Sequence, residues 1–518
     1  MKRANHLKKI KQRKKAWDII IIGGGASGLG AAVDAASRGY KTLLLEKHDF
    51  AKGTSSRSTK LVHGGVRYLQ NGDISLVIEA LKERGIMRKN APHLVQDLSF
   101  VIPSYDWWNS PFYGIGLKVY DMMAGKLGLG PSTLLDREET LDLIPNVKKD
   151  GLRGGVIYHD GQFDDARMAI SLAQTAENHG ASLVNYCGVT GLIKENEMVT
   201  GVHAIDHISN EKFEIAAKVV INATGVFSDD IIQMDEPKSK KLIVPSQGVH
   251  IVLEKKFLDG PHAIMVPHTT DGRVLFAVPW NNYVVVGTTD TLIQKPEDEP
   301  KALESEIDFI LENAGAYMTN IPTRKDIKSV FAGLRPLAAP EDDSNATKEI
   351  SRHHKVRVST SGLVSILGGK WTTYRKMAED MINTAQSVGG LPERACITQN
   401  LPIHGYDYNA DWSNHMHVYG ADLDKLSQLV SVEEHSSSLS PEIPITKSQV
   451  LWAVREEMAM TLEDVLARRT RSLFLNAKAS DDIAPEVAKI MADEMGKNAQ
   501  WIANQLNQFK TVSQHYLL

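Results

Sequence analysis

Hydrophobic positions near the start of the chain follow the order strand, helix, strand. A β-branched run over 19–22 meets a cluster of glycines, and an alanine-rich stretch then reaches Arg38. A second short apolar run follows over 41–46. Short apolar runs predict buried strands, and the alanine-rich stretch between them predicts a helix. This order predicts a β-α-β unit of an α/β fold.

Later apolar runs predict that this unit is interrupted by a second sheet. Residues 219–221 and 363–367 have the composition of further strands of the first unit, whereas 244–290 alternates apolar and polar positions. Alternation with period two predicts antiparallel strands that bury one face. Asn281 and Asn282, between two such runs, predict a tight hairpin turn.

The last part of the chain, after about Gly390, has helical periodicity. Apolar residues recur at helical spacing over 450–465, and Thr446 with Gln449 forms a capping-box pattern at a helix start. Stripes of this kind are typical of helices that pack on one another. We therefore predict a C-terminal α-helical domain.

Composition and charge exclude several classes of protein. The 518 residues carry a net charge of −4, which argues against a protein that coats nucleic acid. The two cysteines, Cys187 and Cys396, fit a reducing compartment and predict neither a disulfide framework nor a metal site. No run of roughly 20 apolar residues predicts a spanning helix. Residues 1–15 carry eight lysines and arginines and no acidic residue, which predicts either a solvated, disordered tail or a surface-binding segment.

A glycine motif follows the first predicted strand. Gly23, Gly25 and Gly28 satisfy the pattern G-x-G-x-x-G at the start of the predicted helix. In such motifs the first glycine permits a tight turn, the second lets a pyrophosphate approach the backbone, and the third lets helix and strand pack closely. Glu46 ends the second strand at the distance expected for an acceptor of ribose hydroxyls. These features together predict a bound dinucleotide.

The next segment favours FAD over NAD. An NAD-binding domain would continue into a second β-α-β half, but the chain enters a hydroxyl-rich loop over 52–60 that includes three cations. Such a loop can supply donors to a pyrophosphate and to the ribityl chain of a flavin. The segment 222–225, Asn-Ala-Thr-Gly after a buried strand, resembles a second fingerprint of FAD-binding oxidoreductases.

Three long motifs extend beyond the glycines, over 54–69, 333–337 and 367–376. They resemble the signature of FAD-dependent glycerol-3-phosphate dehydrogenases, most closely the mitochondrial type. The resemblance runs from about Trp17 to the arginine-rich run at 468–471. Calcium regulation by EF-hands is not implied, because no D-x-[DN]-x-[DN]-G loop follows residue 400. The segment Gln247–His250 differs from the Lys-Gly-Ser-His of many bacterial members, so we assign it no role.

The resemblance implies oxidation of sn-glycerol 3-phosphate to dihydroxyacetone phosphate, with hydride transfer from C2 to N5 of FAD and electrons passed to a membrane quinone. It implies that Arg335 and Arg352 bind the phosphate and that Arg67 is a third active-site arginine, since guanidinium groups pair bidentately with phosphate. Its motif position makes His63 the expected base. Lys370 is expected beside the flavin edge. The residues expected to contact FAD are Gly23, Gly25, Gly28, Glu46, Thr54, Ser55, Ser58, Lys60, Gly225, Gly369, Lys370 and Thr372.

The sequence leaves two alternatives to this function open. One is an FAD-dependent glycerophosphate or amino-acid oxidase that uses oxygen, and another is a non-catalytic or RNA-modifying flavin module. The expected location is the cytoplasm, peripheral on the inner face of the cytoplasmic membrane, with the mitochondrial inner membrane as the alternative. Expected partners are a quinone and an anionic membrane surface, with no nucleic acid and no metal, and a homo-oligomer is left open.

The predicted architecture is thus a discontinuous Rossmann-like FAD-binding domain, an inserted mixed or antiparallel β-sheet substrate domain and a C-terminal α-helical domain. The expected boundaries are 1–15 for a basic tail, 16–105, 150–243 and 345–388 for the FAD-binding domain, 106–149 and 244–344 for the substrate domain, and 389–518 for the C-terminal domain.

Overall fold

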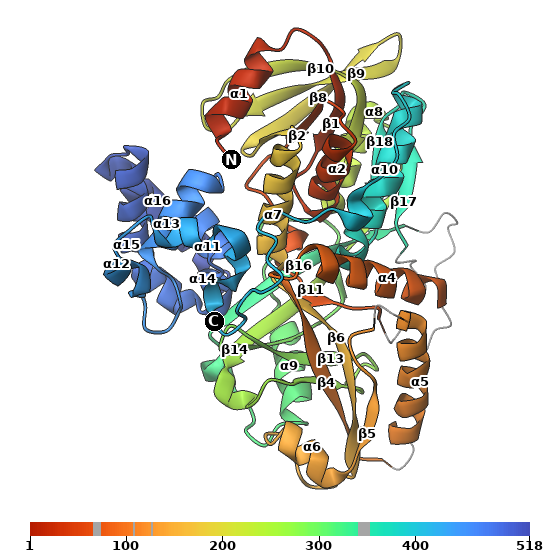
Figure 1. Ribbon diagram of the computed structural model, residues 1–518, viewed down its shortest axis with the longest axis vertical. Coiled ribbons are helices and arrows are strands. Elements are labelled where there is room, and N and C mark those ends of the chain that lie inside the picture. The colour runs from red at the N-terminus through yellow and green to blue at the C-terminus, as the bar shows by residue number, and fades with distance from the viewer. Residues whose placement is uncertain (66–73, 107–108, 126–127, 340–352) are drawn as a thin grey trace.

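The computed structural model describes the whole chain except residues 66–73, 107–108, 126–127 and 340–352 (Figure 1). Its first sheet has the strand order β17-β18-β10-β1-β2-β7, and β8 and β9 continue from β10 as antiparallel strands. β1 pairs in parallel with both β10 and β2. The strands are β1 (Trp17–Ile22), β2 (Thr42–Leu45), β7 (Ser182–Val184), β8 (Cys187–Glu195), β9 (Met198–Asp206), β10 (Lys212–Asn222), β17 (Lys355–Val358) and β18 (Val364–Leu367).

Both faces of this sheet are covered, which explains why β1 is a continuous apolar run rather than an alternating one. Ile19 and Ile21 join a core with the helices on one face, and Ile20 and Ile22 join a second core on the other face. Helices that contact this sheet include α2 (Ala26–Ser37), α7 (Asp165–Asn178), α8 (Ser228–Asp235) and α10 (Tyr374–Val388). The predicted β-α-β unit is confirmed.

The second sheet is mixed, with the order β15-β11-β14-β13-β12-β4-β6-β3, and β16 and β5 pair with β11 and β6. Only β12 and β4 pair in parallel among its described strands. Asn281 and Asn282 have φ of 46° and 63°, as the predicted hairpin turn between β13 and β14 requires. The strands are β3 (Leu61–Val62), β4 (Val95–Ser104), β5 (Thr133–Leu135), β6 (Gly154–Phe163), β11 (Ile243–Glu254), β12 (Ala263–Val266), β13 (Leu275–Trp280), β14 (Tyr283–Gly287), β15 (Thr291–Leu292) and β16 (Ser329–Ala338). Nearby helices are α4 (Ile74–Asn90), α5 (Asn109–Ala124), α6 (Arg137–Leu143) and α9 (Glu304–Gly315).

The strands that pair in the second sheet correct part of the predicted division of the chain into domains. β3, β4 and β6 fall in segments that we assigned to the FAD-binding domain, but they pair in the second sheet, where β4 and β6 run side by side from Val95–Phe163 to Ser104–Gly154. The boundaries at 105 and 150 are therefore wrong for these strands. Local alternation identifies a strand but does not tell which sheet it joins, because pairing depends on residues far away in sequence.

The C-terminal part is helical, as predicted, and it packs on the second sheet. Its core includes Val450, Val465 and Phe474 together with Trp280 and Phe331 from strands β13 and β16. The capping box at Thr446 and Gln449 is present. A π-helical turn, η10 (Asp464–Arg469), precedes α14. The α-helices are α11 (Leu423–Ser427), α12 (Val432–Ser436), α13 (Lys447–Glu456), α14 (Ser472–Leu475), α15 (Ala477–Met495) and α16 (Ala499–Ser513).

The basic N-terminal segment is not a disordered tail, so the first of its two predicted alternatives is wrong. It forms helix α1 (Arg3–Gln12), which lies against the first sheet (Figure 1). Ile10 is buried, Arg3 pairs with Asp206 (2.7 Å), and His6 lies 2.8 Å from Glu177. These partners are remote in sequence, so the charge run alone did not reveal them. No helix in the described ranges is long and apolar enough to cross a membrane.

Candidate active site

The glycine turn after β1 leaves no room for side chains. A Cβ on Gly28 would lie 1.9 Å from the carbonyl oxygen of Gly23, and one on Gly23 would lie 2.6 Å from that of Ala223. Gly23 also has a φ of 108°, which favours glycine. A Cβ on Gly25, the residue before α2, would lie 3.0 Å from Ser55 Oγ. This geometry fits the roles that we predicted for the three glycines.

A cavity of about 370 Å³ opens beside this turn. Glu46, at the end of β2, accepts hydrogen bonds from the backbone N–H groups of Gly24 (2.5 Å) and His48 (2.8 Å). It therefore both braces the turn and presents a carboxylate to the cavity. The predicted cofactor residues that line this cavity are Gly23, Gly25, Glu46, Thr54, Ser55, Gly225, Gly369 and Lys370.

The hydroxyl-rich loop lies across the start of α2. Ser55 Oγ accepts from the N–H of Ala26 (2.9 Å), and the Ser55 carbonyl accepts from the indole N–H of Trp371 (2.9 Å). Thr54 Oγ1 donates to the carbonyl of Leu334 (2.5 Å). Backbone amides at a helix start and hydroxyl donors suit a pyrophosphate. The glycine turn, Glu46 and this loop together fit an FAD molecule.

A second cavity of about 220 Å³ adjoins the first, and Thr54, Pro336, Gly369 and Lys370 line both. It brings together three of the five predicted catalytic residues, His63, Arg335 and Lys370. Arg67 and Arg352 lie outside the described residues. The other predicted residues that line it are Ser58 and Thr372.

Arg335 is held firmly at the wall of the second cavity. Its guanidinium donates to the Thr289 carbonyl (3.1 Å) and Thr288 Oγ1 (3.2 Å), and lies 3.3 Å from Asp290 Oδ1. A Cβ on Gly248 would lie 2.5 Å from Arg335 Nη2, so the glycine makes room for the guanidinium. The side chain is 27% exposed, which leaves part of it open to a ligand.

His250 is a cavity residue that the sequence reasoning missed. It lies on β11, is buried, stacks on Phe331 (4.8 Å between ring centroids), and its Nε2 is 2.8 Å from Thr59 Oγ1. Burial and the charges of Lys60 and Arg335 hold the pKa of His250 well below its ordinary value. We assigned no role to this segment because it departs from the family motif. The available signal was alternation, which puts His250 and Gly248 on one face of the strand.

Lys60 is a predicted cofactor contact that the structure contradicts. Its φ of 65° turns the side chain inward, where Nζ lies 2.8 Å from both Asp165 Oδ2 and the Ser56 carbonyl. Three aromatic rings lie within 5.4 Å of Nζ, and Lys60 is not among the described residues that line either cavity. Burial lowers its pKa to about 7. The Ser58 hydroxyl also donates to Asp165 (2.7 Å).

The fold and the glycine-rich cavity define an FAD-dependent oxidoreductase. The family model described as FAD dependent oxidoreductase matches residues 18–375, and that of the C-terminal domain of alpha-glycerophosphate oxidase matches residues 362–501. The chain is 38% identical to the mitochondrial glycerol-3-phosphate dehydrogenases of Mesocricetus auratus, over 523 residues, and of Homo sapiens, over 526 residues. Each alignment covers 93% of this chain and 71% of the relative. The chain belongs to the FAD-dependent glycerol-3-phosphate dehydrogenase family.

Solved structures agree with this assignment. The glycerol-3-phosphate dehydrogenase of Bacillus halodurans, complexed with FAD, superposes with a TM-score of 0.80 at 28% identity, covering 99% of this chain and 97% of that one. The FAD-bound L-alpha-glycerophosphate oxidase of Mycoplasma pneumoniae superposes with a TM-score of 0.56 at 16% identity over 75% of this chain and 98% of that one, a likeness of fold. The predicted family, fold class and cofactor are confirmed.

Proposed function

We propose that this chain oxidises sn-glycerol 3-phosphate to dihydroxyacetone phosphate. The observation that carries the proposal is that Arg335, His63 and Lys370 line one cavity beside the glycine-rich cavity, in a chain 38% identical to mitochondrial glycerol-3-phosphate dehydrogenases. When bound, FAD supplies a two-electron acceptor for hydride. The C2–H bond of the substrate gives up that hydride, and the C2 hydroxyl releases a proton as the carbonyl forms.

The residues of the second cavity have separate roles in binding and proton transfer. The Arg335 guanidinium binds the phosphate dianion, because its planar fork offers two parallel donors. His63 accepts the hydroxyl proton, since an ordinary imidazole has a pKa of about 6.5 and suits proton transfer at neutral pH. Lys370 places positive charge where negative charge develops during hydride transfer. Arg67 and Arg352 remain predicted partners of the substrate.

Anaerobic mixing of the purified holoprotein with substrate tests this proposal. Glycerol 3-phosphate should bleach the flavin absorbance, whereas glycerol should do so far more weakly, because a guanidinium built to bind an anion is then left without its partner. Comparable rates with glycerol and with its phosphate would contradict the substrate assignment.

We also propose that a membrane quinone takes the electrons. The dehydrogenase relatives and the family membership favour this acceptor over oxygen, although the match to the C-terminal domain of alpha-glycerophosphate oxidase keeps the oxidase worth testing. A non-catalytic or RNA-modifying flavin module is not favoured. After reduction by substrate, reoxidation by a soluble quinone analogue should outpace reoxidation by dissolved oxygen. Faster reoxidation by oxygen would replace the proposal with an oxidase.

An anionic membrane surface is the proposed place of this reaction, the inner face of the cytoplasmic membrane or the mitochondrial inner membrane. Its support is the set of cations on α1 and the segment after it, of which Lys8, Lys9, Lys14 and Lys15 are exposed. Each lysine contributes about 1 kcal/mol near an anionic surface at low salt. Because α1 is folded onto the sheet, deleting it would disturb packing, so the test replaces these four lysines with glutamine.

The quadruple variant should pellet less with anionic vesicles than the wild type, and the difference should shrink as salt rises. A matched control replaces four exposed lysines elsewhere with glutamine, at positions Lys238, Lys241, Lys255 and Lys295. Equal loss in both variants, or no loss in either, would show that this segment does not direct the protein to the membrane. Mass measurement by light scattering of the same wild-type sample tests for a homo-oligomer.

A further inference from the structure

Three arginines of the C-terminal helical part contact the loop that lines the FAD cavity. Arg468, Arg469 and Arg471 lie in and just after the π-helical turn η10, and each is at most 2% exposed. Arginine is rarely buried unless it is paired. None of the three is among the described residues that line either cavity, so they act on the site only through the loop over 49–60.

Asp49 is the first point of contact, at the start of this loop. Its carboxylate accepts from Arg468 Nε (2.6 Å), Arg469 Nη1 (2.7 Å) and Arg469 Nη2 (2.9 Å). Burial opposes ionisation of Asp49, but the charges of Arg469 and Arg468 outweigh it and hold the pKa below the ordinary value. The neighbouring residues His48 and Lys52 line the FAD cavity, so this carboxylate fixes backbone that forms the cavity wall.

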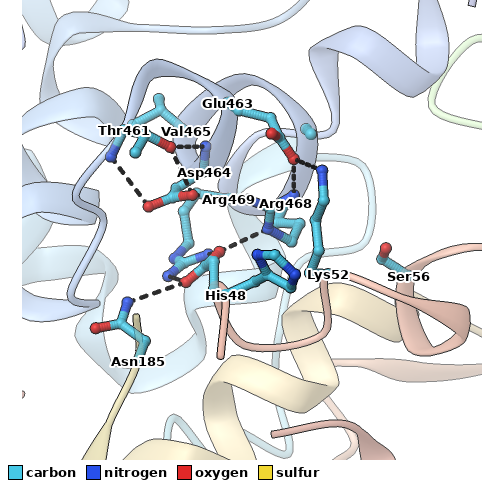
Figure 2. A network of polar contacts seen from close by, with 12 residues as sticks. His48, Lys52, Ser56, Asn185, Thr461, Glu463, Asp464, Val465, Arg468 and Arg469 are labelled. Carbon is cyan, nitrogen blue, oxygen red and sulfur yellow. Dashed lines mark hydrogen bonds and ion pairs between the residues drawn. The ribbon is translucent and has the colours of Figure 1, made fainter. Parts of the chain in front are cut away.

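Lys52 extends the contact, as Figure 2 shows. Glu463 Oε1, at the start of the π-helical turn, accepts from both Lys52 Nζ (2.5 Å) and Arg468 Nη1 (2.6 Å). Lys52 also pairs with Glu299 (2.7 Å), from the segment between β15 and α9. A cation at the cavity wall is thus oriented by a carboxylate from the C-terminal part.

The far end of the loop is held by the third arginine. Arg471 Nη2 donates to the Ser56 carbonyl (2.7 Å) and to Asp165 Oδ1 (3.1 Å). Lys60 donates to the same carbonyl and to the other oxygen of Asp165. Between the two anchors lies Ser55, whose Oγ meets the start of α2.

We propose that the C-terminal helical part belongs to the FAD site, and that Arg468, Arg469 and Arg471 are positioning residues that fix the loop in its cofactor-binding shape. A loop held at both ends presents its hydroxyl and backbone groups without the entropic cost of ordering them at the moment of binding. FAD binding and docking of the C-terminal helices then stabilise each other, because binding free energies between linked sites are reciprocal.

The variant Asp49→Asn in the full chain tests this proposal, because it removes the charge that both arginines share and keeps the shape of the side chain. The matched control is Asp34→Asn on α2. Asp34 is a buried aspartate held by Arg38 Nε (3.1 Å) and Nη2 (2.5 Å), and its described hydrogen bonds involve no residue of the loop. The FAD dissociation constant is measured by flavin fluorescence on reconstituted apoprotein, alongside the Tm of the apoprotein.

Asp49→Asn should weaken FAD binding about tenfold to a hundredfold, the loss typical when a partner that orients a ligating group is removed. At saturating FAD its KM for glycerol 3-phosphate should stay at the wild-type value, which separates a cofactor effect from a failure of the substrate proposal. Asp34→Asn should lower the Tm of the apoprotein but leave the FAD dissociation constant unchanged. Wild-type FAD affinity in Asp49→Asn, or equal weakening in both variants, would overturn the proposal.

A milder variant covers the case in which Asp49→Asn does not fold. Glu463→Gln breaks the link between Arg468 and Lys52 at a site that is partly exposed. It should weaken FAD binding by a smaller factor of about threefold to tenfold, below the range expected for Asp49→Asn, because the contacts of Asp49 with both arginines remain. An unchanged dissociation constant in this variant would overturn the proposal equally.

Discussion

Replacing Arg335 with lysine is the most direct test of how the second cavity recognises its substrate. The guanidinium is held by the Thr289 carbonyl and by Thr288 Oγ1, and it lines the cavity with a side chain that is 27% exposed. Lysine keeps the charge but cannot offer two parallel donors or reproduce both supporting contacts. Each hydrogen bond to a charged group contributes about 1.5–3 kcal/mol, so the loss of one of the pair should lower kcat/KM for glycerol 3-phosphate roughly 10- to 150-fold.

Steady-state and single-turnover flavin reduction measure this effect, with FAD content determined on the same samples. The loss should be specific to the phosphate, so kcat/KM for glycerol should change little. Arg324→Lys is the matched control, because the Arg324 side chain is 38% exposed and pairs with Asp308 (2.6 Å) away from both cavities. If Arg335→Lys keeps kcat/KM within threefold of the wild type, or loses as much with glycerol as with the phosphate, Arg335 does not bind the phosphate.

Three further predictions concern the cofactor, the base and the stability of the fold. Gly25→Val should abolish FAD retention, since even a Cβ there would lie 3.0 Å from Ser55 Oγ and would face the cavity; full flavin occupancy after gel filtration would refute this. His63→Ala should slow flavin reduction about 10²-fold while FAD still binds, and a wild-type rate across pH would assign the base to another group. Burial lowers the pKa of His93 to about 3 from the ordinary 6.5, so the folded state loses stability as pH falls from 6.5 toward 3. Urea unfolding should give a loss of about 2 kcal/mol at pH 5 that is absent in His93→Gln, and an equal loss in both proteins would count against the assignment.

The features that the sequence predicted well are those determined by neighbouring residues along the chain. The turn between β1 and α2 follows from a six-residue motif, because its glycines are required by contacts within the turn and with the adjacent strand. The hairpin at Asn281 and Asn282 likewise follows from two residues that tolerate positive φ. Arg335 and His63 came from long motifs, and the structure brings them to one cavity.

What the sequence did not predict depends on partners far along the chain. β4 carries a clear strand pattern, but its pairing with β6 is set by contacts that a local pattern does not contain. The first 15 residues have the composition of a solvated tail, yet Arg3 and His6 find carboxylates at Asp206 and Glu177. Lys60 is of a residue type that commonly binds phosphate. Only the structure shows that its backbone has positive φ and that its side chain points into the core, where it pairs with Asp165.

The loop over 49–60 also joins the cofactor site to the substrate site. Thr54 lines both cavities, and its hydroxyl donates to the carbonyl of Leu334, the residue before Arg335. Arg57 donates to the Ala332 carbonyl on the same strand (3.1 Å). Because strand β16 carries Arg335, which we propose binds the phosphate, a loop that moves when FAD is absent would also shift the strand that positions this arginine. We therefore expect apoprotein to bind glycerol 3-phosphate more weakly than holoprotein does.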